Sequence, residues 1–464
     1  MGIVLKEYLI CNFMQENKEF VKKPVRTISG VTPLTVVLKP RKCDHGTCIY
    51  CPGGDKVPQS YTNKSPAIMR ALALSFDPYE QVLNRLKVLK KMNHPVDKIE
   101  LIVLGGTFLQ YPLDYQYEFI KKCFDALNGK DSKDLEEAKK LNEKAEHRCI
   151  AMCIENRPDN CNEEEIKRML DFGCTRVEIG VQMPDNYLYE KSNRGHTVKD
   201  VVESTQRLKN AGFKLGYHIM PGLPYSDPKK DLEMFKKIFD DSKFRPDQLK
   251  IYPCQVVEDS PLAKIHDLIK FKPYSEEETK DLLEKMMKII PEYCRVMRMM
   301  REFPKEKLID GVERLDLRKD IEENFRRSGE KINEIRMREV GFNQDVDLNV
   351  ELKILEYESS NGREFFLEIV NNKNILFGLL RLRISNKKSI VRELHVYGQA
   401  IKLGEIGEAS QHKGIGKLLL EKAEEITKKN KIEKLSIISG IGVREYYRNL
   451  GYNLEGNYMV KEFS

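Results

Sequence analysis

The stretch 40–54, which reads PRKCDHGTCIYCPGG, holds three closely spaced cysteines. Cys43, Cys48 and Cys51 follow the spacing C-x4-C-x2-C, in a loop closed by one proline and two glycines. This spacing lets a short backbone bring three thiolates to one cubic iron–sulfur cluster, and it leaves the fourth iron without a protein ligand. An open iron can bind the amino and carboxylate groups of S-adenosylmethionine. The stretch therefore predicts a [4Fe–4S] cluster that cleaves this cofactor.

Two other uses of these cysteines compete with the cluster. Together with His45 they have the ligand types and number of a tetrahedral zinc site. Cys48 and Cys51 could instead form a thioredoxin-like redox pair, but this leaves Cys43 unused and lacks the usual preceding strand. The order of elements after the loop separates these alternatives.

The composition describes a large globular protein with reduced thiols. Of 464 residues, 41% are hydrophobic and 33% charged, and no apolar run approaches the length of a membrane span. Eleven cysteines without an extracellular marker favour metal binding over a disulfide framework. We therefore expect a cytoplasmic protein of two or three domains that does not contact a membrane. The net charge of +7 permits a nucleic-acid partner without requiring one.

Strand-like and helix-like segments alternate after the cysteine loop. Apolar runs lie at 34–38, 99–104, 149–154, 176–181, 214–219 and 248–252, and amphipathic stretches lie between them at 78–92, 114–127, 163–170, 198–209 and 230–239. This alternation predicts a parallel sheet covered by helices, and six units suit a partial barrel with its active site at the carboxyl ends of the strands. Several residues just past the strand ends fit that rule: Gly105, Gly106, Glu155, Arg157 and Gln182.

The composition changes beyond residue 290. Arg295, Arg298 and Arg301 recur every three residues, which predicts one face of a helix. Acidic residues nearly balance the basic ones in this segment, so a salt-bridged linker and an RNA-facing surface are both open.

A second pattern begins near residue 346. Strand-like runs at 348–357, 364–370, 376–384 and 389–397 precede a glycine-containing loop and a helix at 418–428. The N–H groups of Gly414 and Gly416 in that loop could bind a pyrophosphate. A further strand at 434–438 follows, and then the pair Tyr446 and Tyr447.

Taken in order, these segments resemble the catalytic subunit of Elongator in its archaeal form. The motifs that carry the resemblance are CIYCPGG (48–54), VDKIELIVLGGTF (96–108), ENRPD (155–159), RVEIGVQ (176–182), NRGHT (193–197), YHIMPGLP (217–224), QHKGIGKLL (411–419) and GVREYYRNLGY (442–452). The resemblance implies an α/β protein with an N-terminal segment at 1–30, a partial (β/α)6 radical-SAM barrel at 31–290, an arginine-rich linker at 291–345 and a mixed α/β GNAT acetyltransferase domain at 346–464. Relatives carry more basic residues at the start, so a shortened N-terminus is expected.

The resemblance also implies an activity. The family uses acetyl-CoA to place a carboxymethyl group on carbon-5 of the wobble uridine of tRNA, and tRNA stimulates its hydrolysis of acetyl-CoA. Cys43, Cys48 and Cys51 would hold the cluster, and S-adenosylmethionine would yield a 5′-deoxyadenosyl radical that takes hydrogen from the acetyl methyl group. The partners would be tRNA, acetyl-CoA and an electron donor that the sequence does not identify, and a homodimer is left open.

The same resemblance assigns binding residues in both halves. Those around the cluster would be Gly105, Gly106 and Thr107 for the methionine amino group, and Glu155, Arg157 and Gln182 for the nucleoside or its carboxylate. Those for acetyl-CoA would be Lys98, Glu393, Leu394, His395, Val396, Gln411, Gly414, Ile415, Gly416 and Lys417. A strand-to-helix turn is the alternative for the first three, and structural ion pairing for the next three.

Tyr447 would be the catalytic residue of the GNAT part. Its phenol would bind the thioester or donate a proton as CoA leaves, with a packed core tyrosine as the alternative. A GNAT domain standing alone would acetylate protein lysines, but no motif specifies a peptide groove or a general base. A tRNA-binding scaffold without activity is a third class, which the intact cysteine triplet disfavours.

Overall fold

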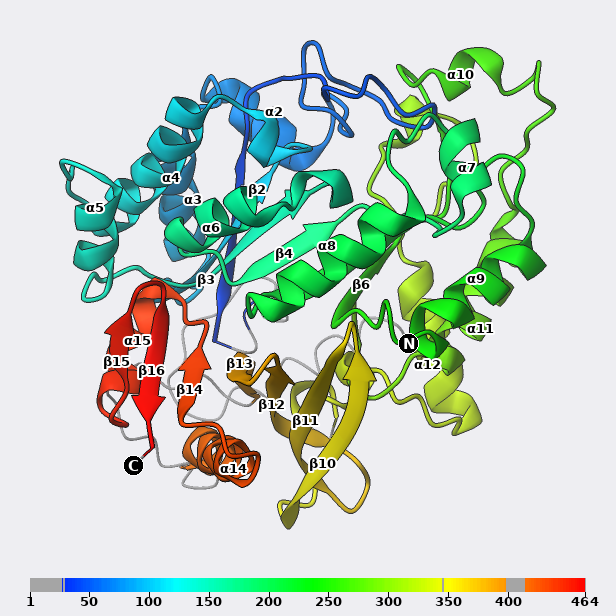
Figure 1. The fold of residues 1–464 in the computed structure, drawn as a ribbon. Coiled ribbons are helices and arrows are strands. Elements are labelled where there is room, and N and C mark those ends of the chain that lie inside the picture. Colours follow the sequence, from blue (N-terminus) through cyan, green and yellow to red (C-terminus); the bar gives the residue numbers. More distant parts are fainter. Residues whose placement is uncertain (1–26, 28–29, 344–345, 398–413, 464) are drawn as a thin grey trace.

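The computed structural model describes residues 27, 30–343, 346–397 and 414–463, and it contains two seven-stranded sheets (Figure 1). The first sheet has the order β1-β2-β3-β4-β5-β6-β8, and all neighbouring strands are parallel. Its strands are β1 (Thr32–Val37), β2 (Lys98–Leu104), β3 (Arg148–Asn156), β4 (Arg176–Ile179), β5 (Lys214–Ile219), β6 (Gln248–Ile251) and β8 (Arg295–Met299). The predicted partial parallel barrel is therefore confirmed.

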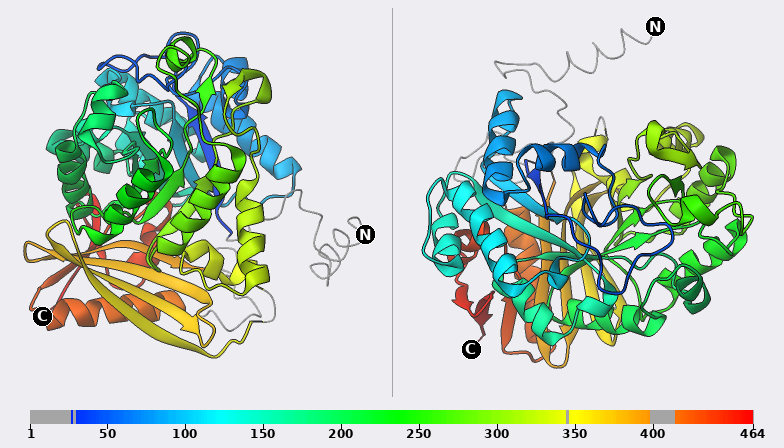
Figure 2. Two further views of the ribbon diagram at one scale, coloured as in Figure 1. Left: turned by 90° about the vertical axis from the view of Figure 1, so that its right-hand side faces the viewer. Right: turned by 90° about the horizontal axis from the view of Figure 1, so that it is seen from above.

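Helices cover the outer face of this curved sheet (Figures 1 and 2). The helices in this part of the chain are α2 (Pro66–Ala73), α3 (Pro78–Lys91), α4 (Leu113–Asn128), α5 (Leu135–Asn142), α6 (Glu163–Asp171), α7 (Asn186–Lys191), α8 (Val198–Asn210), α9 (Pro228–Asp240), α10 (Leu262–Ile265), α11 (Glu276–Ile289), α12 (Leu317–Ser328) and α13 (Ile335–Arg338). Within the described ranges, none of the helices combines the length and apolar character needed to cross a membrane.

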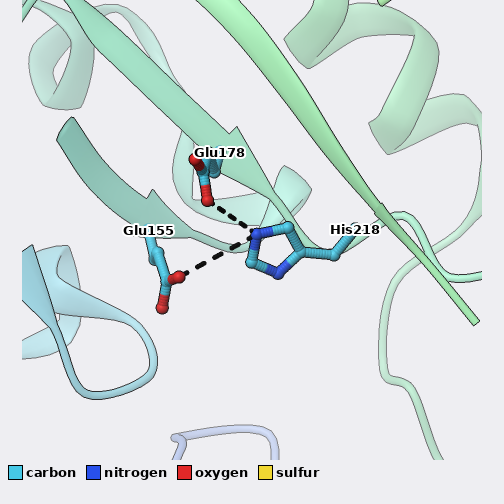
Figure 3. A group of neighbouring side chains, drawn as sticks. All are labelled: Glu155, Glu178 and His218. Atoms are coloured by element: carbon cyan, nitrogen blue, oxygen red, sulfur yellow. Dashed lines mark hydrogen bonds and ion pairs between the residues drawn. The ribbon is translucent and has the colours of Figure 1, made fainter. Parts of the chain in front are cut away.

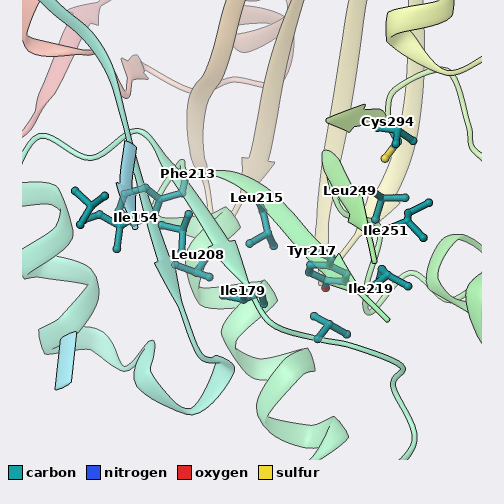
Figure 4. Packing of buried hydrophobic residues seen from close by; sticks show 14 of the residues in the cluster. Ile154, Ile179, Leu208, Phe213, Leu215, Tyr217, Ile219, Leu249, Ile251 and Cys294 are labelled. Atoms are coloured by element: carbon teal, nitrogen blue, oxygen red, sulfur yellow. The ribbon is translucent and has the colours of Figure 1, made fainter. Parts of the chain in front are cut away.

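Caps and apolar spacing fix these elements locally. At the start of α8, Thr197 and Asp200 form a reciprocal capping box, which satisfies backbone N–H groups that have no partner in the helix. Between the sheet and its helices, Ile154 of β3 and Ile179 of β4 pack with Leu208 of α8 (Figure 4). Each such side chain contributes roughly 1.5–3 kcal/mol on burial.

One expectation about the arginine-rich segment is wrong. Arg295 and Arg298 lie on strand β8, not on a helix, and Arg301 follows that strand. β8 pairs in parallel with β6 and adds a seventh strand to the six that were predicted. Its burial does not alternate strictly, because a register shift at Met297 leaves Val296 in the core and Arg298 half exposed. The predicted domain boundaries stay predictions.

The second sheet is mixed and has the order β10-β11-β12-β13-β14-β16-β15. Only β13 and β14 are parallel, and the other neighbours are antiparallel. The elements are β10 (Val350–Ser359), β11 (Gly362–Asn371), β12 (Leu376–Ser385), β13 (Lys388–Val396), α14 (Ile415–Lys429), β14 (Lys434–Ile437), α15 (Arg444–Arg448), β15 (Asn453–Glu455) and β16 (Tyr458–Glu462). Helix α14 packs on the face away from the barrel (Figure 2). This confirms the mixed α/β domain.

The second sheet lies against the amino ends of the barrel strands. The Tyr458 hydroxyl donates to the carbonyl of Ala211, just before β5, at 2.8 Å. Gly440, after β14, lies so close to β3 that a Cβ there would overlap the backbone oxygen of Ile150. The cysteine loop follows β1 and therefore lies at the opposite, carboxyl end of the barrel.

Buried charges join the two sheets. Arg392 of β13 makes two hydrogen bonds of 2.7 Å to Asp247, just before β6, and two, of 2.8 and 3.1 Å, to Glu364 of β11. Arg383 of β12 also contacts Glu364, at 2.9 Å. All four side chains are almost completely buried. Burial alone would raise the pKa of Asp247, but Arg392 and Lys209 hold it well below its usual range.

This network yields a test of stability. We expect Asp247→Asn to lower the free energy of unfolding by about 3–5 kcal/mol, because it leaves buried arginine charge without its anion. Chemical denaturation measures the loss. The matched control is Glu356→Gln, whose partner Arg363 is nearly half exposed, and it should cost about 0–1 kcal/mol. Equal unfolding free energies for the two variants would contradict the role of the network.

Candidate active site

A cavity of about 1340 Å³ runs through the barrel from the cysteine loop to the second sheet. Its lining includes Cys43, Cys48 and Cys51 at one end, Glu155, Glu178, His218 and Lys250 in the middle, and His395, Gly416 and Tyr447 at the other end. Residues that the sequence assigned to two separate sites therefore border one continuous space.

The alternation of the barrel strands makes the interior of this cavity polar. On β2, Ile99 and Leu101 are buried toward the helices, while Glu100 faces the cavity. On β6, Leu249 is in the core while Lys250 faces the cavity. Successive side chains of a strand point to opposite faces. In the sequence QLKI of β6, two residues therefore pack in the core and the other two line the cavity.

The cysteine loop is shaped by tight turns. The Gly46 N–H donates to the Cys43 carbonyl, and the Cys51 N–H donates to the Cys48 carbonyl, both at 3.0 Å. The Cys51 thiol donates to the Ser60 hydroxyl oxygen at 3.4 Å, and the hydroxyl oxygen of Thr107 lies 3.9 Å from the sulfur of Cys43. The turns thus place all three sulfurs on one wall of the cavity.

The three thiols differ in acidity. Burial would raise the pKa of Cys48, but Arg194 and His45 outweigh it and lower the pKa to about 6. Burial and the neighbouring Cys51 raise the pKa of Cys43 to about 11. Only Cys48 is therefore a thiolate at neutral pH by itself, and iron has to displace protons from the other ligands.

The turn after β2 connects the glycine motif to the cysteine loop. Gly105 has a φ of 139° and Gly106 a φ of 92°, both in the region that favours glycine. A Cβ on Gly105 would come within 2.8 Å of the Leu38 Cβ. Thr107 lies near Cys43 and lines the cavity together with Gly106, whereas Gly105 packs against Leu38 and is not part of the lining. The assignment of these residues to the methionine amino group stays a prediction.

Arg157 and Gln182 differ in how they face the cavity. Arg157 donates to Asp159 at 2.9 Å and lies 3.1 Å from the Nε2 of His45, so ion pairing holds most of its guanidinium. Gln182 has a φ of 63°, which is uncommon for a residue with a side chain. Its N–H donates to the His218 carbonyl at 2.7 Å. Such strain clusters at ligand sites.

Three residues in the middle of the cavity were not predicted from the sequence: Glu178, His218 and Lys250. His218 lies 2.8 Å from Glu178 and 3.9 Å from Glu155 (Figure 3). In the described residues, this trio of Glu155, Glu178 and His218 forms the one group with ligand atoms close enough for a single metal ion. However, the ammonium group of Lys250 contacts both carboxylates, at 3.0 Å to Glu155 and closer to Glu178. The Lys250 ammonium group thus supplies the positive charge that a metal ion would otherwise bring to these carboxylates.

Lys98 lies apart from the other residues that were predicted to bind cofactors. It is the first residue of β2, at the amino end of the strand, and it does not line the cavity. Burial lowers its pKa. Its end of the barrel is the one that faces the second sheet.

In the second domain, the pairing between β13 and β14 ends before β13 does. β13 pairs with β14 at 389–391, and its later residues Leu394, His395 and Val396 keep only β12 as a described partner. These three line the cavity along the open edge. Glu393 also lines the cavity, and it pairs with Lys214 of β5 and Arg381 of β12, so its side chain joins the two domains. Burial lowers the pKa of His395 to about 4, which keeps the ring neutral.

The glycine loop opens helix α14. Gly414 has a φ of 101° and precedes Ile415, whose side chain packs in the second core. A Cβ on Gly416 would come within 2.9 Å of the Tyr446 hydroxyl. Lys417 is largely exposed. Gln411 lies outside the described residues.

Tyr447 is buried, yet it borders the cavity. Its ring meets Tyr446 at 5.2 Å and Tyr452 at 6.1 Å. No described residue hydrogen-bonds its hydroxyl, and burial raises its pKa far above neutrality. The phenol therefore carries a proton at physiological pH.

Comparisons with known proteins agree with this architecture. The chain matches the Radical SAM superfamily over residues 37–235 and the Radical_SAM C-terminal domain over residues 246–327. It is 47% identical to the tRNA uridine(34) acetyltransferase of Methanocaldococcus jannaschii, over 95% of this chain and 86% of that one. It is 40% identical to the Elongator complex protein 3 of Schizosaccharomyces pombe, over 95% and 86%. The chain belongs to the Elongator complex protein 3 family.

A solved structure supports the whole fold. The archaeal Elp3 of Methanocaldococcus infernus with an N-terminal deletion superposes with a TM-score of 0.83 at 40% identity. The match covers 94% of this chain and 100% of that one. The expectation that the chain is a radical-SAM member of this family is confirmed, and with it the cluster and S-adenosylmethionine.

The cysteine geometry fits the cluster that the Elongator complex protein 3 family implies. Around one zinc, ligands at about 2.3 Å would lie about 4 Å apart. Within the described ranges, Cys43, His45, Cys48 and Cys51 do not supply three ligand atoms within 4.8 Å of one another. Three sulfurs that each bind a different iron do not have to converge on one ion, so the arrangement suits a cluster better than a single zinc. Two buried polar atoms beside the sulfurs, the Tyr50 hydroxyl and Gln59 Oε1, have no described partner.

Iron content tests this site. After anaerobic reconstitution we expect about four irons per chain and a large loss in Cys48→Ala, because two thiolates hold a cubic cluster poorly. Elemental analysis measures the loss. Cys123→Ala is the matched control, since Cys123 is a buried free thiol in the core, and it should keep its iron. Stoichiometric zinc without iron in the parent protein would contradict the assignment.

Proposed function

We propose that this chain forms 5-carboxymethyluridine at the wobble position of tRNA, with acetyl-CoA as the source of the added carbons. The observation that carries the proposal is the continuous cavity, which the cysteine loop borders at one end and Tyr447 at the other. A cofactor held at either end can meet a substrate in the middle. The names of the relatives, which specify uridine 34 of tRNA and acetyl transfer, support the same reaction.

At the cysteine end, S-adenosylmethionine bound to the cluster supplies a radical able to take hydrogen from a methyl group. Gly105, Gly106 and Thr107 form the turn beside Cys43 and are proposed to hold the methionine part. Gln182 is proposed to orient the nucleoside, because its strained backbone turns a side-chain amide toward the cavity. Arg157 is proposed to act through His45, which it contacts.

At the other end, acetyl-CoA is proposed to lie between β13 and α14. The edge of β13 at 394–396, which has no strand partner among the described residues, is proposed to offer backbone groups to the pantetheine amides. The N-terminus of α14 offers N–H groups of Ile415, Gly416 and Lys417 to the pyrophosphate. This arrangement aims the thioester at Tyr447, whose protonated phenol can donate to the departing sulfur.

The middle of the cavity matches a uracil ring. Uracil offers carbonyl oxygens as acceptors and one N–H as a donor. Lys250 supplies donors, and Glu155 supplies an acceptor that already takes hydrogen bonds from Lys250 at 3.0 Å and Tyr61 at 3.2 Å. We propose that the base docks here, so that the acetyl carbon and carbon-5 of the ring meet in one space.

A lysine side chain of a protein fits this site less well. It would have to enter the same barrel interior to reach the acetyl group, because the thioester end of the second domain faces the cavity. We infer tRNA as the partner, a one-electron donor as a further requirement, and the cytoplasm as the location. The homodimer stays a prediction.

Nucleoside analysis tests the proposal. Reconstituted protein is incubated without oxygen with unmodified tRNA, S-adenosylmethionine, a reductant and acetyl-CoA, and the digested nucleosides are measured by mass spectrometry. We expect carboxymethyluridine that depends on all components. Acetylation of lysine peptides without any tRNA product would overturn the proposal.

The role of Tyr447 can be measured separately. Tyr447→Phe should slow thioester cleavage by about 10²-fold, because it removes a positioned proton donor. Acetyl-CoA binding should change little. Tyr452→Phe is the matched control, since its hydroxyl is bonded to Glu424 in the core, and it should keep the rate of cleavage. An unchanged rate in Tyr447→Phe would make Tyr447 a packing residue.

The basic rim of the cavity should bind phosphates. Arg298 is half exposed and lines the cavity, whereas Arg295 is held by Glu339. Arg298→Ala should weaken tRNA binding and reduce the slope of log affinity against log salt by about 0.7–0.9. Arg363→Ala on β11 removes an arginine of similar exposure and should leave the slope unchanged. Equal slopes in both variants would assign Arg298 to its pair with Glu302.

A further inference from the structure

Arg194 differs from every other buried arginine in the described part of the chain. The others contact a carboxylate, as Arg157 does with Asp159 and Arg176 with Glu100. Arg194 is only 7% exposed, and no described carboxylate lies within ion-pair distance of it. A buried charge without a counter-ion strongly opposes folding. The structure must therefore supply an anion of another kind.

That anion is a ligand sulfur of the cluster site. One terminal nitrogen of Arg194 donates to Cys48 Sγ at 3.5 Å, and the other donates to the Gly180 carbonyl at 2.5 Å. Its Nε has no described partner. Burial disfavours the charge of Arg194, but Tyr50 and Cys48 hold its pKa above the usual value.

Neighbouring groups fix Arg194 in place and leave it as the donor to this sulfur. The carbonyl of Arg194 accepts from Arg157 at 2.8 Å, and its N–H donates to the Tyr189 carbonyl at 2.8 Å. His45 Nε2 also lies 3.4 Å from Cys48 Sγ, but it faces an Arg157 nitrogen at 3.1 Å. Since Arg157 can only donate, that imidazole nitrogen acts as an acceptor.

The other two ligand sulfurs face neutral groups. Ser60 contacts Cys51, and Thr107 lies near Cys43. We propose that Arg194 is a positioning residue that raises the reduction potential of the cluster through its fixed charge beside Cys48. A cubic cluster on three thiolates is anionic and gains one more negative charge on reduction, so a buried cation favours the reduced form. Reduction potentials of such clusters depend on net charge, hydrogen bonds to sulfur and solvent exposure.

The inference rests on cluster binding at the three cysteines, and iron analysis tests that part independently. The variants are Arg194→Gln, which keeps a polar group without the charge, and Arg194→Lys, which keeps the charge. The control is Arg444→Met, a buried arginine paired with Glu143 at the domain interface. Each reconstituted protein is assayed for iron, and its midpoint potential is measured by redox titration with electron paramagnetic resonance, without S-adenosylmethionine or tRNA.

We expect full iron in Arg194→Gln but about tenfold less reduced cluster at a fixed potential, which equals a shift of about 59 mV for one electron. The midpoint potential of Arg194→Lys should stay nearer to that of the parent protein, and the midpoint potential of Arg444→Met should equal it. Loss of iron from Arg194→Gln alone, with Arg194→Lys retaining it, would also support the role of the charge. Equal potentials in the parent and Arg194→Gln, or equal loss of iron in Arg194→Gln and Arg194→Lys, would overturn the inference.

Discussion

The relative position of the two domains depends on the buried contact of Arg392 with Asp247 and Glu364. Asp247 precedes a barrel strand and Glu364 belongs to the second sheet, so one guanidinium joins both domains. A buried ion pair of this kind is weak evidence for net stability, because desolvation offsets the attraction. Its effect is on geometry, because the two charge-assisted hydrogen bonds from Arg392 to Asp247 form only when β13 lies at the start of β6. The pair Lys214–Glu393 adds a second contact of the same kind.

Because the two domains dock in this way, residues of both domains border one cavity. The second sheet sits at the amino ends of the barrel strands, which are the ends opposite the cysteine loop. A barrel interior is usually filled by apolar side chains. Here alternate strand residues such as Glu178, His218 and Lys250 keep it polar and hollow, so the cavity reaches from the cysteines to Tyr447. The bound base and the acetyl group can then react without release.

Local patterns allowed much of this to be predicted from the sequence. The cysteine spacing, the strand–helix alternation and the glycine loop before α14 each depend on residues close together in the chain. β8 was missed because arginines every three residues suit one face of a helix, and a sequence does not reveal the register shift at Met297 that brings Arg295 and Arg298 to the cavity together. The sequence analysis missed Glu178, His218 and Lys250, because the local sequence does not indicate which face of a buried strand lines a cavity. Contacts such as Lys214 with Glu393 join residues 179 positions apart, and a single sequence does not indicate them.

We propose that one cavity brings the acetyl group to the radical generated at the cysteine loop. Acetyl-CoA with a fully deuterated methyl group tests it most directly, with 5′-deoxyadenosine analysed by mass spectrometry after anaerobic turnover with tRNA. We expect 5′-deoxyadenosine to gain deuterium only when tRNA is present. Deuterium-free 5′-deoxyadenosine alongside carboxymethylated tRNA would contradict it.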